Sequence, residues 1–224
     1  MPNDILYPSN LKIAAHHEAG HAVVAKLFTW PVEGMVLSTD PAGNWGGCTY
    51  ENAVRQIDPL WVNLDLDRYL PYAELHLQYP GHRYPHVEYK NHRDFCTYKC
   101  AGIAAELLLC EQLGVSRKPT MPDEDTQDMK EARARIMRIF PSEEWEYELH
   151  NAATHAKEIL SHPTCWRLLE NLATGLINAI LEGKNRAEQD GSNLVYRFSD
   201  EELYANFAQT LGDKRDSTDS LPHV

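Results

Sequence analysis

The segment His17-Glu18-Ala19-Gly20-His21 combines residue types that bind metal ions and move protons. It lies in a stretch of helical periodicity, so the two imidazoles, four residues apart, share one helix face and can reach one ion. Glu18 is rotated by about 100° from His17, where a carboxylate can take a proton from a zinc-bound water. Metal-assisted peptide hydrolysis requires this arrangement. The pattern therefore predicts metal ligands at His17 and His21 and a general base at Glu18.

A catalytic zinc centre needs a third protein ligand and keeps its fourth position open. No further histidine follows at short spacing, so this ligand must come from farther along the chain. The candidates are acidic residues on or just before later helices, and spacing alone does not choose among them: Glu106, Glu111, Asp123, Glu124, Asp125 and Asp128.

Two neighbours of the motif carry expectations of their own. Gly20 lies inside the helix, where glycine costs roughly 0.5–1 kcal/mol relative to alanine, so it predicts close packing or access at that point. His16 lies about 100° off the ligand face, and we expect it either beside the metal ligands as a supporting residue or, by preference, at the surface. The competing interpretation of the pair is two structural histidines in a helical protein with an accidental motif, which predicts no bound metal.

Composition excludes several classes of function. The 224 residues are 43% hydrophobic and 24% charged, which is ordinary for one compact globular domain. A formal net charge of −12 repels phosphate backbones and argues against a nucleic acid partner. No apolar run approaches the roughly 20 residues of a membrane helix, and residues 1–20 lack a secretory pattern. We therefore expect no membrane insertion, a cytoplasmic location and five reduced cysteines.

Periodicity and turn signals predict the order of the elements. We expect a helix over 9–29, β-type runs over 32–38 and 47–51 around a turn at 40–44, and helices over 94–114, 126–140, 142–162 and 163–184. The last two are expected to pair in antiparallel fashion. Ser199 and Glu202 form a capping-box pattern for a final helix ending near Gly212.

These elements define a fold class and a domain organisation. The fold is expected to be mainly α with a small β-sheet or hairpin (α+β). We expect a single domain over 1–212, with an irregular insertion over 57–93 that has no sustained period, and a flexible C-terminal tail over 213–224.

Several motifs, in the same order, resemble the peptidase domain of the FtsH-type ATP-dependent zinc proteases. The run from His17 to Ala25 resembles the start of that domain, and 32–38 followed by 46–50 resembles its strands. The segments 101–106 (Ala-Gly-Ile-Ala-Ala-Glu) and 128–132 (Asp-Met-Lys-Glu-Ala) resemble its later helices. The resemblance implies a helical zincin in which Asp128 is the third Zn²⁺ ligand beside His17 and His21. Glu106 remains the second choice as a ligand, and we prefer it as an acceptor next to the site.

The resemblance also has departures. Ile103 replaces the family's arginine, and Gln127 replaces its asparagine. We also expect the protein to have neither the ATPase module nor the membrane anchor of the family. Taken with these departures, the resemblance implies a stand-alone zinc metalloendopeptidase that cleaves unfolded proteins or peptides. In this enzyme Glu18 activates a zinc-bound water. A peptide is expected to add to the sheet edge near Val36 or Thr49. The family's ring assembly implies self-association, and a separate ATPase is an expected partner.

The alternative function is a catalytically silent pseudo-peptidase that contains the metal and binds a peptide or protein. In that case the aromatic insertion over 57–93 would occupy the cleft.

Overall fold

The computed structural model describes residues 9–28, 32, 34–49, 86–115, 126–185, 187–203 and 205, with 86–91 described as backbone only. The expected tail over 213–224 lies outside these ranges. So does the expected irregular insertion as far as residue 85, whereas its last part, 86–93, is helical.

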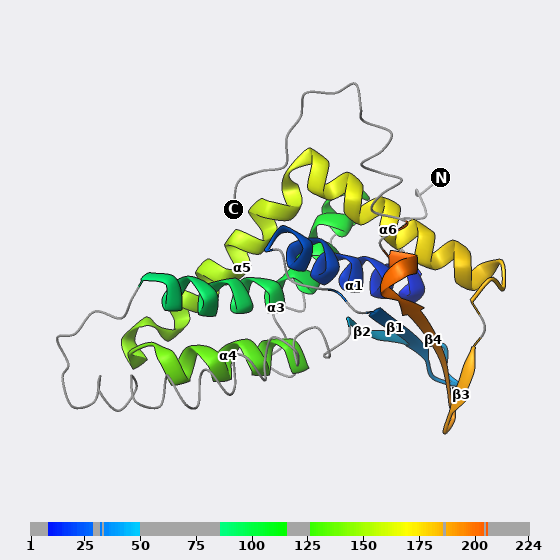
Figure 1. The fold of residues 1–224 in the computed structure, drawn as a ribbon, viewed down its shortest axis with the longest axis horizontal. Coiled ribbons are helices and arrows are strands. Elements are labelled where there is room, and N and C mark those ends of the chain that lie inside the picture. Colours follow the sequence, from blue (N-terminus) through cyan, green and yellow to red (C-terminus); the bar gives the residue numbers. More distant parts are fainter. Residues whose placement is uncertain are drawn as a thin grey trace.

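The described chain is mainly helical, with one small antiparallel sheet (Figure 1). The helices are α1 (Asn10–Leu27), α3 (His86–Gln112), α4 (Gln127–Ile139), the short 3-10 helix η1 (Ser142–Glu144), α5 (Trp145–Ser161) and α6 (Pro163–Leu181). The strands are β1 (Gly34–Thr39), β2 (Trp45–Thr49), β3 (Glu188–Asp190) and β4 (Asn193–Ser199). They lie in the order β2-β1-β4-β3. The expected α+β class is confirmed.

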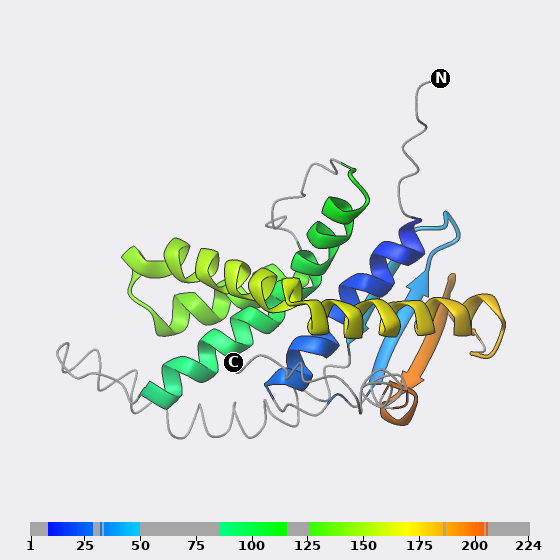
Figure 2. The same cartoon turned by 90° about the horizontal axis from the view of Figure 1, so that it is seen from above.

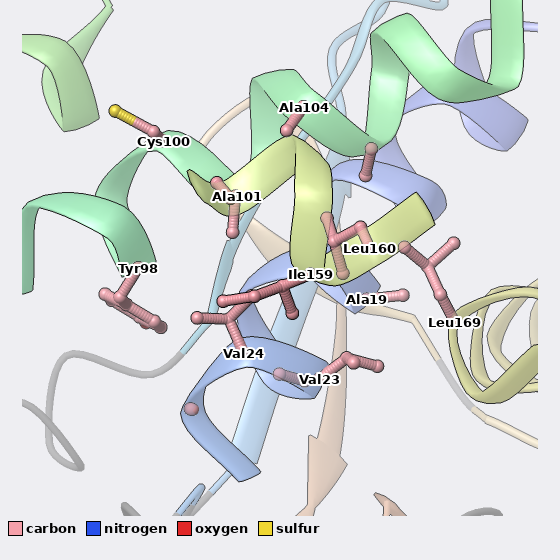
Figure 3. Packing of buried hydrophobic residues seen from close by; sticks show 14 of the residues in the cluster. Ala19, Val23, Val24, Tyr98, Cys100, Ala101, Ala104, Ile159, Leu160 and Leu169 are labelled. Atoms are coloured by element: carbon pink, nitrogen blue, oxygen red, sulfur yellow. The ribbon is translucent and has the colours of Figure 1, made fainter. Parts of the chain in front are cut away.

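The central element is α1, which lies between the sheet and the other helices. It packs against α3, α6 and β2, and α3 in turn contacts α4 and α5. Figure 2 shows α6 crossing over α1 and the sheet. Figure 3 shows the apolar core where these helices meet; the labelled side chains are Ala19, Val23, Val24, Tyr98, Cys100, Ala101, Ala104, Ile159, Leu160 and Leu169. Small residues on α1 and α3 allow the two helices to approach closely.

Local signals fix the ends of the two helices that carry the site. α1 begins as expected, because the Ser9 hydroxyl accepts a hydrogen bond from the Lys12 amide at 3.2 Å. α4 begins where the Thr126 hydroxyl accepts one from the Met129 amide at 3.3 Å, which places Asp128 in the first turn. α1 ends near the expected position, with its last residue at Leu27.

The longest helix, α3, begins earlier than predicted. It starts at His86, eight residues before the expected start at Asp94. The sequence did not indicate these first turns because they are polar and lack the apolar period that marks a buried helix. A helix once nucleated extends at low cost over such residues. It ends as expected before Gly114, whose φ of +63° suits a residue just past a helix end.

Two predictions about the C-terminal half were wrong or incomplete. α5 and α6 do not form an antiparallel pair: α5 packs mainly on α3 and α6 on α1, and Figure 2 shows α6 running on from the end of α5. The hairpin of β3 and β4 was not predicted. Its turn contains Gly191, whose φ of +62° is typical of a tight hairpin turn. The capping box is confirmed, with the Ser199 amide donating to Glu202 Oε2 at 2.8 Å.

Within the described ranges, none of the helices combines the length and the apolar character needed to cross a lipid bilayer.

Candidate metal centre

Three side chains from distant parts of the chain converge where α1, α3 and α4 meet. His17 Nε2 lies 3.2 Å from His21 Nε2, and Asp128 Oδ2 lies 3.4 Å from the former and 3.2 Å from the latter. Two atoms that bind one zinc ion tetrahedrally at about 2.0–2.1 Å lie roughly 3.3–3.4 Å apart. The three separations match the edges of such a tetrahedron, so the group could hold a metal ion.

The other ring nitrogen of each histidine already has an acceptor. His17 Nδ1 lies 2.8 Å from Glu106 Oε1, and His21 Nδ1 lies 2.7 Å from the backbone oxygen of Tyr98. These partners accept hydrogen bonds, so each Nδ1 carries the proton that it donates. When the imidazoles are neutral, each Nε2 then turns a lone pair toward the other and toward Asp128. Acceptor atoms this close repel one another unless a proton or a metal ion lies among them, so the group could hold a metal ion, and the outer acceptors would orient both rings as in known zinc sites.

The electrostatics of the group favour a cation. Burial disfavours the imidazolium form of His17, but hydrogen bonds to Asp128 and Glu106 and the charge of Glu18 outweigh it and raise the pKa to about 10. Burial likewise opposes the ionised form of Asp128. The facing histidines and Lys99 prevail and hold the pKa of that carboxyl far below its usual range. Surroundings that favour a proton on imidazole also favour a divalent ion.

A network from α3 and α4 holds Asp128. Its Oδ1, the oxygen turned away from the histidines, accepts a hydrogen bond from Lys99 Nζ at 3.1 Å. Lys99 also pairs with Glu131 at 2.6 Å, and its side chain is 8% exposed. Burial lowers the pKa of Lys99, but the charges of Asp128 and Glu131 raise it above its usual value, so the ammonium persists. The ligand on α4 is thereby tied to α3.

Two glycines let α1 and α3 approach closely enough to build the centre. A Cβ added to Gly20 would lie 2.6 Å from the backbone oxygen of Ala101 and 2.8 Å from Cβ of Ala105. A Cβ added to Gly102 would overlap the His17 ring at Nε2. Any larger residue would push the helices apart or displace the ring. Of the two explanations expected for Gly20 inside α1, close packing and access, the structure supports close packing.

Glu18 lies beside the ligand pair and faces β2. Its side chain is 3% exposed, and its Oε2 lies 2.7 Å from the hydroxyl of Thr49, which also lies 3.1 Å from the Glu18 backbone oxygen. A Cβ on Gly47 would lie 2.6 Å from Glu18 Cγ, so the glycine leaves the space that Glu18 occupies. The strand therefore fixes the carboxylate from one side.

A cleft of about 360 Å³ extends from the centre along the sheet. It is lined by the first half of α1, the turn into β2 and one residue of α3: Asn10, Ile13, Ala14, His17, Glu18, Asn44, Trp45, Gly46, Gly47 and Glu106. The Trp45 ring stacks on Tyr196 with centroids 5.7 Å apart. Among the described strands, β2 lies at one edge of the sheet and pairs only with β1. The cleft thus runs from His17 and Glu18 at the candidate metal centre to the edge strand β2.

The structure separates the acidic candidates for the third ligand. Asp128 joins the histidines, whereas Glu106 contacts His17 Nδ1, away from the converging atoms, as preferred. Glu111 pairs with Lys157 at 2.5 Å instead. The remaining candidates, 123–125, lie outside the described residues.

The preferred expectation for His16, a position at the surface, was wrong. It is 3% exposed, and its Nδ1 lies 2.7 Å from the Lys12 backbone oxygen. Its ring centroid lies 6.2 Å from that of Trp166 on α6, because the face of α1 beside the ligand face is covered by that helix. Burial, more than the nearby Lys12 charge, lowers the pKa of His16 to about 4.

Sequence reasoning missed two polar residues that contact the site. Lys99 lies within the apolar stretch of α3, and a charge in such a stretch needs a buried partner, which was the available signal. Thr49 has no such signal, because a threonine in a strand is ordinary and only the packing of α1 on β2 brings it to Glu18.

Comparison of the chain with protein-family models, with curated proteins and with solved structures finds no match.

Proposed function

We propose that this chain is a zinc-dependent metallopeptidase with a helical zincin fold like that of the FtsH-type peptidase domain. One observation carries the proposal: His17 Nε2, His21 Nε2 and Asp128 Oδ2 converge within 3.2–3.4 Å, with Glu18 and a cleft beside them. Two imidazoles and a carboxylate form a donor set that suits zinc. The family resemblance of the motifs supports the same conclusion.

Each side chain would have a distinct part in hydrolysis. His17, His21 and Asp128 would hold the ion, and Glu106 and the Tyr98 carbonyl would orient the two rings. A bound zinc ion would polarise the scissile carbonyl and make a water molecule more acidic. Glu18, oriented by Thr49, would accept the proton from that water at a carboxylate oxygen and return it to the leaving amine nitrogen.

The strand edge at the cleft would bind the substrate backbone. An extended peptide can add to β2 by main-chain hydrogen bonds, which tolerate varied sequence. Thr49 lies on this strand, as expected, but Val36 does not lie at an edge, because β1 is paired on both sides. Ile13 and Trp45 in the cleft walls would favour an apolar side chain near the scissile bond. Unfolded protein segments supply both an extended backbone and accessible apolar side chains.

The test is cleavage of quenched fluorescent peptides by Zn²⁺-loaded protein and by Glu18→Gln. General acid–base catalysis contributes about 100- to 10,000-fold, so the variant should lose that factor in kcat while retaining its zinc. Glu111→Gln, which alters a glutamate paired with Lys157 away from the cleft, is the matched control and should cleave like the parent. Equal cleavage by Glu18→Gln with zinc bound would contradict the mechanism.

The same assay examines the alternative of a silent binding module. The buried hydrogen bond between Thr49 and Glu18 is the observation that favours it, because it could hold Glu18 away from a substrate. In that case the zinc-loaded parent binds the peptides without cleaving them.

A further inference from the structure

A buried cation lies directly behind the candidate ligand Asp128. Lys99 Nζ lies 3.1 Å from Asp128 Oδ1 and 2.6 Å from the carboxylate of Glu131. The rings of Phe95 and Tyr98 lie 5.8 and 5.5 Å from the same nitrogen and shield it from water. The ammonium is thus held by two carboxylates from α4 and covered by two rings from its own helix.

This contact distinguishes the two oxygens of Asp128. Oδ2 faces the histidines, while Oδ1 is engaged by a charged donor, and charge-assisted hydrogen bonds are about twice as strong as neutral ones. An aspartate with both oxygens available can bind an ion through one or both of them. A second bound oxygen would fill the position that a catalytic zinc site keeps open.

We propose that Lys99 is a positioning residue that keeps Asp128 a monodentate metal ligand and so preserves an open coordination position. The role rests on metal binding at His17, His21 and Asp128, and not on peptide cleavage. Lys99 also places a positive charge near the ion, which weakens the binding of a cation. The lysine therefore keeps a coordination position open and lowers the affinity of the site for the metal ion.

Cobalt substitution tests this role in the full chain. Tetrahedral Co²⁺ absorbs visible light much more strongly than five- or six-coordinate Co²⁺, so the spectrum reports the coordination number. In Lys99→Met we expect the visible absorption to fall several-fold as the second oxygen of Asp128 joins the ion. Zn²⁺ affinity, measured by chelator competition, should rise by at least about tenfold, because a neighbouring positive charge is removed.

Two further variants control for the effects of the substitution itself. Lys99→Arg keeps the charge and the donors and should keep the cobalt spectrum of the parent. Glu131→Gln removes the other carboxylate partner of Lys99 but leaves the contact with Asp128, and should also keep that spectrum. A lysine that only supports folding would weaken Zn²⁺ binding when replaced and leave the spectrum unchanged, and that result would overturn the proposal.

X-ray absorption of the Zn²⁺-loaded parent protein tests the same point if Lys99→Met does not fold. We expect four light-atom ligands at about 2.0–2.1 Å. Two carboxylate oxygens from Asp128 in the parent would overturn the role of Lys99 alone. Absence of bound Zn²⁺ or Co²⁺ would overturn the metal centre as well, whereas a metal-loaded but inactive protein would contradict only the peptidase function.

Discussion

The two ends of α4 give two histidines, the partly buried His17 and the buried His92, opposite surroundings. At its first turn, Asp128 faces His17, and nearby carboxylates raise the pKa of that imidazole to about 10 against the effect of burial. Toward its last turns lie Arg135 and Arg138, near His92 of α3, which is 1% exposed. There burial, aided by the two arginines, lowers the pKa of His92 to about 3.

The difference shows that the sign of the facing charge decides what a histidine at a helix interface can do. Carboxylates at the acidic end attract a proton or a divalent ion, and arginines at the basic end repel both. The same distribution suits the helix itself, because Asp128 lies in its first turn and Arg138 in its last, each complementing the helix dipole. One helix thereby serves a candidate metal centre at one end and keeps a histidine neutral at the other.

We expect the largest difference between the two ends of α4 when one histidine is replaced at each end. We expect His17→Ala to weaken Zn²⁺ binding by more than the roughly 100-fold that loss of an outer hydrogen-bond partner costs, because a direct ligand is removed. His92→Leu should leave Zn²⁺ affinity unchanged. Isothermal titration calorimetry of both variants measures this, and equal affinities would mean that the two histidines do not differ in function.

A second substitution disturbs the acidic end without altering any ligand. We expect Gly102→Ala to lower the free energy of unfolding by about 3 kcal/mol, because the added methyl group overlaps the His17 ring and the two helices must shift. Zn²⁺ binding should weaken in parallel. Gly46→Ala is the control, since a Cβ there would meet no atom within 4 Å. Denaturant unfolding of both variants provides the measurement, and similar losses would argue against close packing at Gly102.

The two histidines that face the acidic end of α4 were predictable from the sequence. The spacing of His17 and His21 places them on one helix face, and that geometry does not depend on the rest of the fold. Asp128, in contrast, was one of six acidic candidates until the family resemblance singled it out. No local pattern brings residue 128 to residue 17, because only the packing of α3 between α1 and α4 does so.

The basic end and the sheet were harder to predict for related reasons. His92 lies in the polar stretch assigned to an irregular insertion, because helical periodicity is weak there. β4 completes the sheet by pairing with β1, roughly 160 residues away in the chain, and short strands carry little period of their own. Tertiary contacts, not local preference, determine both regions.

The smallest expected effect is on the acid sensitivity of the metal-free protein, which tests the basic end of α4 alone. The folded pKa of His92, about 3, lies below the unfolded value of about 6.5, so between these values the unfolded chain binds more protons. The contribution of neutral His92 to the free energy of unfolding is therefore fully present above pH 6.5. It falls as the pH decreases, by about 2 kcal/mol at pH 5. Urea unfolding at pH 7 and pH 5, with chelator present, should show His92→Leu losing about 2 kcal/mol less than the parent. An equal loss would mean that His92 takes up a proton without unfolding, and that the arginines do not keep it neutral.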